Sequence, residues 1–170
     1  MNHELLLWLE FLGQTPLELR FRLLLRNRSD VSLLLPYPEV HGLRFENKAT
    51  RQESEWYGSC VTALNWLGFT LRPGEDEEVE YRVRPSDAPD PTEDDFSDYS
   101  RWYVELPPGE YWVQFKCRMD KDYFCPDTHC RYGDIVQEAK EVKATVWMGQ
   151  VVSNALSLIR HRSVTEPTPL

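Results

Sequence analysis

Apolar and polar residues alternate along much of the chain, most clearly from Leu17 to Arg26. Leucines and Phe21 occupy every second position there, and glutamate and arginine occupy most of the positions between. Successive side chains of a strand point to opposite faces, so this pattern predicts a strand with one buried and one solvated side. Asn27 to Asp30 then has the composition of a turn. Val31 to Leu35 predicts a returning strand, which Pro36 and Pro38 end.

The same phrase opens two later strands. Leu71-Arg72-Pro73-Gly74-Glu75 precedes an alternating run that includes Val79, Tyr81 and Val83, and Leu106-Pro107-Pro108-Gly109-Glu110 precedes one that includes Tyr111, Val113, Phe115 and Cys117. Proline cannot donate a ladder hydrogen bond, and glycine accepts a positive φ angle. Each Pro-Gly pair therefore marks the place where a strand begins.

Shorter segments complete an all-β pattern. A strand is favoured over a helix for Leu5 to Phe11, while Ser54 to Leu67 is compatible with a strand or a short helical turn. Further strands are expected near 43–45, 69–71, 101–106, 142–147 and 152–159, with an exposed loop at 87–100 and a polar connection at 119–134. No helix of useful length is expected. Eight or nine short strands at roughly ten-residue spacing predict an antiparallel sandwich or barrel. We expect a single domain over residues 1–162 and a flexible tail over 163–170.

Several of these phrases resemble the immunoglobulin-like domains of bacterial proteins. Leu19 to Leu35 resembles their opening strand, Asn turn and apolar strand; Phe69 to Glu75 and Val104 to Val113 match two later phrases; and Trp147 to Ile159 resembles a closing W-x-G-x-V-x-S-N strand. The set is similar to the Bacillus intracellular proteinase inhibitor family and to the N-terminal sandwich of deuterolysin-like peptidases. The resemblance implies an immunoglobulin-like β-sandwich over about residues 17–160. The chain departs from the inhibitor family in its Cys-bearing insertion and acidic loop, and no inhibitory loop residue can be matched.

The net charge of −9 is concentrated in one part of the 170-residue chain. Eleven of the 28 acids lie between Glu75 and Asp98, opposed there by two of the 19 Lys and Arg residues, so the rest of the chain is neutral. Nucleic acid is therefore a poor partner, because phosphate binding needs a basic surface. Apolar runs are too short to cross a bilayer. The N-terminal residues lack the basic start of a signal peptide, so we expect a cytoplasmic protein without membrane insertion.

Four cysteines offer the first candidate chemistry. Cys117 shares the apolar face of Tyr111 and Phe115, so we expect a buried core thiol. Cys125, His129 and Cys130, with Cys60 as a distant fourth, leave three possibilities open: a zinc site, a Cys125–Cys130 disulfide, or free thiols. Free thiols are favoured, and no cofactor is predicted.

The acidic loop is the second candidate. Asp90, Glu93, Asp94, Asp95 and Asp98 supply oxygen ligands, but they lack the residue order of a calcium-binding loop. A solvated loop is the plainest interpretation. A docking surface for a basic partner is the functional one, because charge of one sign steers association.

Exposed tryptophans are the third candidate. Trp112 alternates against Tyr111 and Val113, and Trp102 against Tyr103, so at least one large aromatic must point away from the core. A second packed face would explain this, and an aromatic patch for protein or carbohydrate is the alternative. Catalysis is not supported: the nucleophile and nucleotide motifs are absent, and nothing fixes His41 beside Cys60 as a thiol base.

Together these features predict a non-catalytic protein-interaction module whose partner is another protein. The acidic loop and Cys-bearing loop are its expected contacts. An intracellular proteinase inhibitor and a carbohydrate-binding module using Trp102 or Trp112 remain as alternatives.

Overall fold

A computed structural model of the chain describes residues 4–60, 68–85, 100–120 and 132–161. These residues form an all-β sandwich, as the alternating pattern predicts, together with one α-helix that the pattern does not predict. The elements in chain order are β1 (Leu5–Gln14), β2 (Leu19–Asn27), β3 (Leu33–Pro36), η1 (Val40–Gly42), β4 (Leu43–Asn47), β5 (Trp56–Cys60), β6 (Gly68–Leu71), β7 (Asp76–Pro85), β8 (Ser100–Val104), β9 (Gly109–Met119), α1 (Tyr132–Glu141), β10 (Thr145–Val146), β11 (Gly149–Val152) and β12 (Leu156–Arg160).

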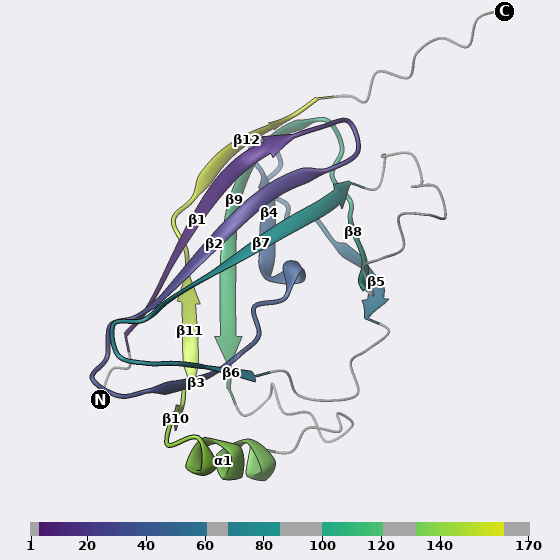
Figure 1. Ribbon diagram of the computed structural model, residues 1–170. Helices are drawn as coiled ribbons and strands as arrows, with labels where there is room; N and C mark the ends of the chain where they lie inside the picture. The colour runs from purple at the N-terminus through teal and green to yellow at the C-terminus, as the bar shows by residue number, and fades with distance from the viewer. Residues whose placement is uncertain (1–3, 61–67, 86–99, 121–131, 162–170) are drawn as a thin grey trace, which may run out of the picture.

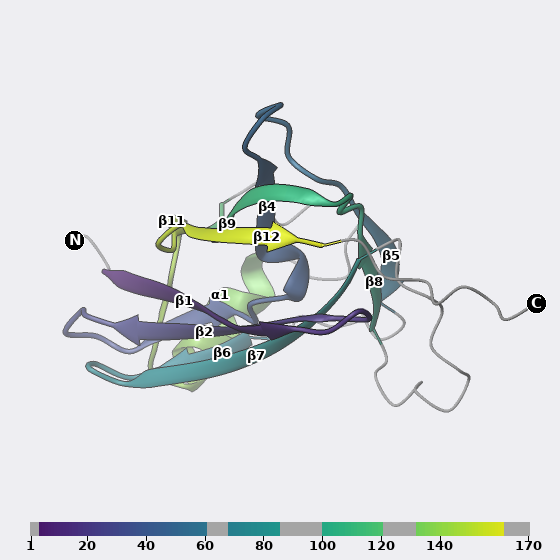
Figure 2. The same cartoon turned by 90° about the horizontal axis from the view of Figure 1, so that it is seen from above.

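Two layers enclose the core. One sheet has the strand order β1-β2-β7-β8-β5, and the other is built on β9, which pairs with β4, β11 and β12. Figure 2 shows β1, β2 and β7 in one layer and β9 and β12 in the other. A small sheet of order β10-β3-β6 lies at one end, next to α1 (Figure 1).

Aromatic pairs connect the two layers. Phe21 of β2 meets Phe45 of β4 with ring centroids 5.9 Å apart, and Tyr81 of β7 stacks on Phe115 of β9 at 5.7 Å. The alternating apolar residues of β2, β7 and β9 that the sequence assigns to one face are buried, so the period-two pattern identified the core correctly.

Two strand expectations require correction. The described residues contain twelve strands rather than eight or nine, because several have only two to four residues. One of these is β11, which includes Gly149 and Gln150, where an interruption was expected; the last predicted strand, 152–159, corresponds mainly to β12. In addition, β10 pairs with β3 and β7 with β8 in the parallel direction, each over two residues. Such short pairings need no βαβ unit.

The helix α1 was not expected from the sequence. Ile135 and Ala139 are one helical turn apart and both are buried, but a ten-residue helix containing Gly133 leaves too few apolar positions to establish a 3.6-residue period. The helix ends in a Schellman arrangement: Ala144 N–H bonds Ala139 C=O at 2.8 Å, and Lys143 has a φ of 55°. Val142, predicted on a strand, is an exposed residue that follows the helix.

The two Pro-Gly phrases differ in structure. The first forms a turn, with Gly74 at φ 75° and Glu75 N–H bonded to Arg72 C=O at 3.0 Å. Gly109 has no positive φ and is the first residue of β9. Both phrases mark the start of a strand as predicted, but a left-handed glycine is present only in the first.

Candidate functional site

The candidate site is a pocket of about 280 Å³ between the β3–β4 connection and the C-terminal half of β9. In Figure 1, β4 runs beside only part of β9, and the blue segment that leads into β4 passes beside the remainder. The lining residues are Pro36, Tyr37, Pro38, Glu39, His41, Gly42, Arg44, Phe115, Lys116, Cys117, Arg118 and Asp120. None of them belongs to the set of binding residues that the sequence suggested.

The wall formed by residues 36–42 is fixed by contacts with both layers. Tyr81 of β7 donates a hydrogen bond to Pro38 C=O at 2.6 Å and stacks on Phe115. Gly42 lies directly over the Phe115 ring, since a Cβ there would be 2.5 Å from Phe115 Cζ. Pro36 and Pro38 are buried, and Tyr37 between them is 45% exposed. The connection therefore holds Tyr37 at the surface in a restricted backbone conformation.

A strand edge forms the opposite wall. β4 pairs with β9 only as far as Leu43 opposite Phe115, whereas β9 continues to Met119. From Lys116 to Met119 one edge of β9 pairs with β11. The other edge has no strand partner among the residues that the structure describes.

Charged groups around the pocket have altered pKa values. Burial raises the pKa of Glu39. Desolvation by surrounding protein, and then the charge of Arg44, lower the pKa of His41, although its side chain stays accessible at the rim. The Arg44 Nη1 pairs with Glu53 at 2.8 Å, while its Nε is buried and lacks a hydrogen-bond partner within the described part of the chain. Ionisable groups with shifted pKa values in a concave site are typical of ligand-binding sites.

The thiol of Cys117 is not a reactive group at neutral pH. It is a free, buried cysteine, as the strand pattern predicted, and burial raises its pKa to about 12. A thiolate is the nucleophilic and metal-binding form, so this residue contributes apolar surface to the wall.

Most of the predicted site residues lie outside the described residues. This applies to Asp90, Glu93, Asp94, Asp95 and Asp98 of the acidic loop and to Cys125, His129 and Cys130. Trp102 belongs to β8, but its side chain is likewise outside the description. Among the side chains that are described, no group of three or more His, Cys, Asp or Glu could hold a metal ion.

Trp112 is the predicted aromatic whose position can be tested. It is 40% exposed and points away from the core, whereas Trp147, which also alternates with apolar neighbours, is 3% exposed. Lys48 Nζ lies 4.3 Å from the centroid of the Trp112 ring and also bonds Ser157 Oγ at 2.6 Å. A sugar that stacks on this ring face would have to displace a cation–π contact, which weakens the carbohydrate hypothesis at Trp112.

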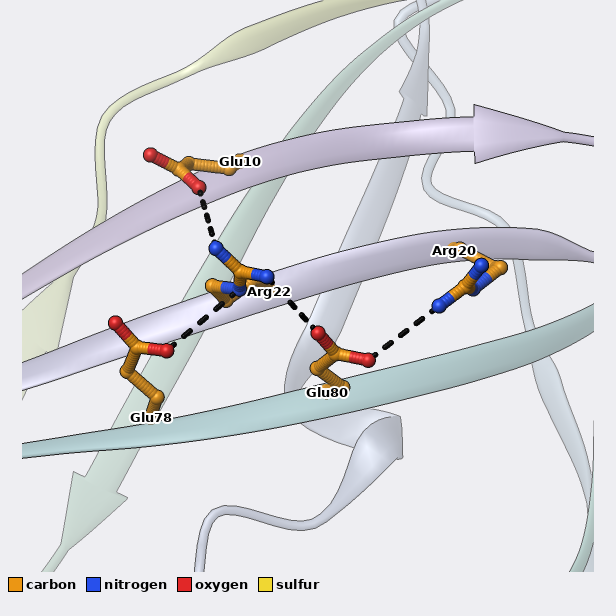
Figure 3. A network of polar contacts seen from close by, with 5 residues as sticks. All are labelled: Glu10, Arg20, Arg22, Glu78 and Glu80. Atoms are coloured by element: carbon orange, nitrogen blue, oxygen red, sulfur yellow. Dashed lines mark hydrogen bonds and ion pairs between the residues drawn. The ribbon is translucent and has the colours of Figure 1, made fainter.

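The acidic start of β7 is paired across the sheet. Figure 3 shows Arg22 among three carboxylates, with Glu80 at 3.0 Å and Glu10 and Glu78 each at 3.7 Å; Arg20 lies 3.4 Å from Glu80. Asp76 forms a bidentate pair with Arg26. Arginines on the polar face of β2 therefore balance acids that the sequence places in one negatively charged segment.

A second hollow, of about 590 Å³, is less suited to specific binding. Polar residues of the turn after β4 form much of its wall, together with Glu53, Glu55 and Glu105. The hydroxyl of Tyr57 lies 3.0 Å from Glu105 and 3.1 Å from Glu55, and these contacts raise its pKa to about 12. The first pocket combines aromatic walls with both signs of charge, so we take it as the candidate site.

The site's sequence signal is the run Pro36-Tyr37-Pro38-Glu39-Val40-His41-Gly42. Two prolines around an aromatic residue indicate a constrained, exposed loop. The part of the site that β9 forms has no local signal in the sequence. The length of β4, a different strand, determines which part of the β9 edge is left unpaired.

A comparison with protein-family models, curated proteins and solved structures found no match. The resemblance to immunoglobulin-like inhibitor domains therefore stays a prediction. In the described regions, no helix has the length and apolar character needed to span a membrane.

Proposed function

We propose that this chain is a non-catalytic β-sandwich that acts as a protein-interaction module, with the pocket beside β9 as its contact surface. The observation that supports this most is the position of Tyr37, which two buried prolines present at the rim of a charged pocket. Tyrosine and arginine are enriched among residues that dominate interface energetics, and Arg44 and Arg118 line the same pocket.

The construction of the wall also favours binding. The Tyr81–Pro38 hydrogen bond and the Gly42–Phe115 contact fix the connection to the two layers. A surface that is already ordered loses little conformational entropy when a partner binds. The free, buried thiol of Cys117 is compatible with the reducing cytoplasm, where we place the protein.

Photo-crosslinking tests this proposal. Tyr37 is replaced by p-benzoylphenylalanine, and the irradiated full chain is recovered from an extract of the source organism. We expect one defined cross-linked protein, because position 37 lies at the contact surface. Val142, exposed at the end of α1, carries the same group in the control variant and should give no such product. A cross-link at 142 alone, or at neither position, would contradict a contact surface at Tyr37.

Protease inhibition is a second candidate, favoured by the Pro36-Tyr37-Pro38 segment itself. Side chains that enter a protease cleft must be exposed on a constrained, extended backbone, and Tyr37 is exposed between two residues with fixed φ angles. Titration against a panel of serine, cysteine and metalloproteases measures it. An inhibitor would lose most of its potency on Tyr37→Ala; absence of inhibition by the unmodified chain would exclude this role for the tested enzymes.

A further inference from the structure

We propose that the pocket binds an extended, acidic segment of a partner protein as an added strand on the unpaired edge of β9. This inference rests on the proposed function and specifies the chemistry of the partner. Three features of the structure support it: the direction of the backbone groups of β9, the place where β4 ends, and the charges along the edge.

The backbone of β9 presents hydrogen-bonding groups toward the pocket. Phe115 N–H donates to Ser153 Oγ at 2.8 Å, and its C=O accepts from Ser153 N–H at 2.9 Å, so both Phe115 groups point toward the β11–β12 side. Backbone groups alternate in direction along a strand. The N–H and C=O groups of Lys116 and Arg118 therefore point to the opposite edge, where β4 has ended.

No described residue of the chain continues the ladder at this edge. β4 begins at Leu43, and Gly42 N–H bonds Glu39 C=O at 2.9 Å within η1 instead of extending toward Lys116. The edge from Lys116 to Met119 spans about 13 Å at the rise of a β-strand. An incoming segment of four or five residues would continue the line of β4, in the binding mode known as β-augmentation.

Charge selects the side chains of that segment. Arg44, Lys116 and Arg118 lie on the outer face of β4 and β9, where alternate side chains of an added strand would also point. Among the described residues Lys116 makes no ion pair, whereas Arg44 pairs with Glu53 at 2.8 Å and Arg118 with Asp120 at 2.5 Å. A carboxylate of the added strand beside Lys116 would form the charge-assisted bond that Lys116 does not make with the described residues, and further carboxylates at alternate positions would be attracted to Arg118 and Arg44.

The intervening side chains would face the other way, toward the walls contributed by Phe115 and Cys117. Both residues are buried and present apolar surface. The recognised segment is therefore an alternation of acidic and apolar residues, which is also a sequence that adopts an extended strand.

A labelled heptapeptide of alternating Glu and Val provides the first test, with fluorescence anisotropy as the measurement. We expect it to bind the full chain, and we expect the Lys-Val peptide of the same length to bind at least about tenfold more weakly. Lys116→Glu should weaken the Glu-Val peptide by about tenfold or more, since it reverses an exposed charge at the edge. Lys140→Glu makes the same change on α1 and should leave the affinity unchanged. Equal affinities for the two peptides, or equal effects of the two variants, would overturn the proposal.

Backbone N-methylation tests strand addition itself. Only every second amide of an added strand donates to β9. Methylating the peptide amides that face β9 should abolish binding, while methylating the alternate amides, which face away from β9, should preserve it. If both methylated peptides lost binding to the same extent, the loss would not depend on which amides face β9, and the added-strand geometry would be wrong.

These tests are separable from the test of the proposed function. If the partner still cross-links at position 37 in the Lys116→Glu variant and no peptide binds, the added-strand proposal fails while the interaction module stands. If no partner cross-links at position 37, the proposed function fails, whichever peptide binds.

Discussion

Single side chains determine several of the chain's turns. Asn27 is fully buried at the end of β2; its Nδ2 donates to Val31 C=O at 2.8 Å and to Leu71 C=O at 2.9 Å, and its Oδ1 accepts from Ser29 N–H. One amide thus connects β2, the turn after it and β6. Gly42 has a comparable importance for a different reason, because the Phe115 ring leaves no space for a side chain.

Replacing Asn27 should be costly. Asn27→Ala removes the donor to the buried carbonyl of Leu71 and leaves that of Val31 only the Ser29 hydroxyl at 3.0 Å. We expect a loss of about 2–4 kcal/mol in the free energy of unfolding, measured by urea denaturation. Asn27→Asp preserves the shape but removes the same donors, so it should destabilise the protein at neutral pH at least as much. A stable Asp variant would show that the two donated bonds are not responsible.

Gly42→Ala should destabilise the protein by about 1–3 kcal/mol, because Phe115 must move away from a Cβ at 2.5 Å. Gly133→Ala is the matched control: no atom lies within 4 Å of its Cβ position, and alanine favours the helix α1. We expect it to be neutral or stabilising by up to about 1 kcal/mol. Thermal and urea unfolding of both variants would measure the difference, and equal effects would contradict the packing argument.

Among the elements, β2 and β7 show how neighbouring strands share charge. Arg22 and Arg26 of β2 stand opposite carboxylates of β7, and Arg20, which stands opposite Arg82, pairs with Glu80 instead. The polar face of this sheet is therefore a ladder of ion pairs. The bond from Arg22, followed by the charges of Arg22 and Arg20, lowers the pKa of Glu80. Exposed pairs of this kind contribute little individually, and their contribution weakens with salt.

Arg22→Gln should raise the pKa of Glu80 toward its ordinary value of 4.5, as followed by NMR of the side-chain carboxyl carbon. Because the pKa of Glu80 is lower in the folded state than in the unfolded state, its ionised form stabilises the folded protein. This contribution to the free energy of unfolding is present above pH 4.5 and is lost as the pH falls through the folded-state pKa. Arg44→Gln, which removes the pair with Glu53, should not alter this titration. An unchanged Glu80 pKa in the Arg22 variant would show that the ladder does not form in solution.

At the scale of the whole molecule, the first and last described strands join the two layers. Asn154 lies between β11 and β12, and its side chain bonds both backbone groups of Leu9 in β1, at 2.7 Å to N–H and 3.0 Å to C=O. An amide side chain thus acts as a one-residue strand partner at the edge of β1. Ser153 beside it bonds Phe115, so the Ser-Asn pair of the closing phrase has a structural role in the sandwich.

Asn154→Ala should open this junction. We expect faster hydrogen exchange at the Leu9 amide and its β1 neighbours, by about tenfold or more, because the edge loses both bonds. Asn47→Ala is the control, since the Asn47 side chain also makes two hydrogen bonds to backbone groups, but it accepts both from the local turn, at Ala49 and Thr50. If both variants left exchange in β1 unchanged, the closure would not depend on Asn154.

Local chemistry was sufficient to predict the main strands, the buried face of each and the inward position of Cys117. These properties follow from side-chain alternation and from the backbone limits of proline and glycine. The sequence also showed that the acids are concentrated in one segment, but it did not show which basic residues pair with them. Which strand lies opposite β7 is a matter of pairing across 50 or more residues.

The sequence by itself therefore determined an all-β chain with a period-two core. Only the tertiary structure decided that β4 ends before β9 does, that Gly42 covers Phe115, and that Asn154 closes the edge of β1. Each of these depends on where distant strands stop relative to one another, and alternation along a single strand is the same whether its edge is paired or open. The open edge of β9 in the candidate site arises from such a difference in strand length, so no local motif indicated it, whereas the two prolines of the opposite wall are a local signal.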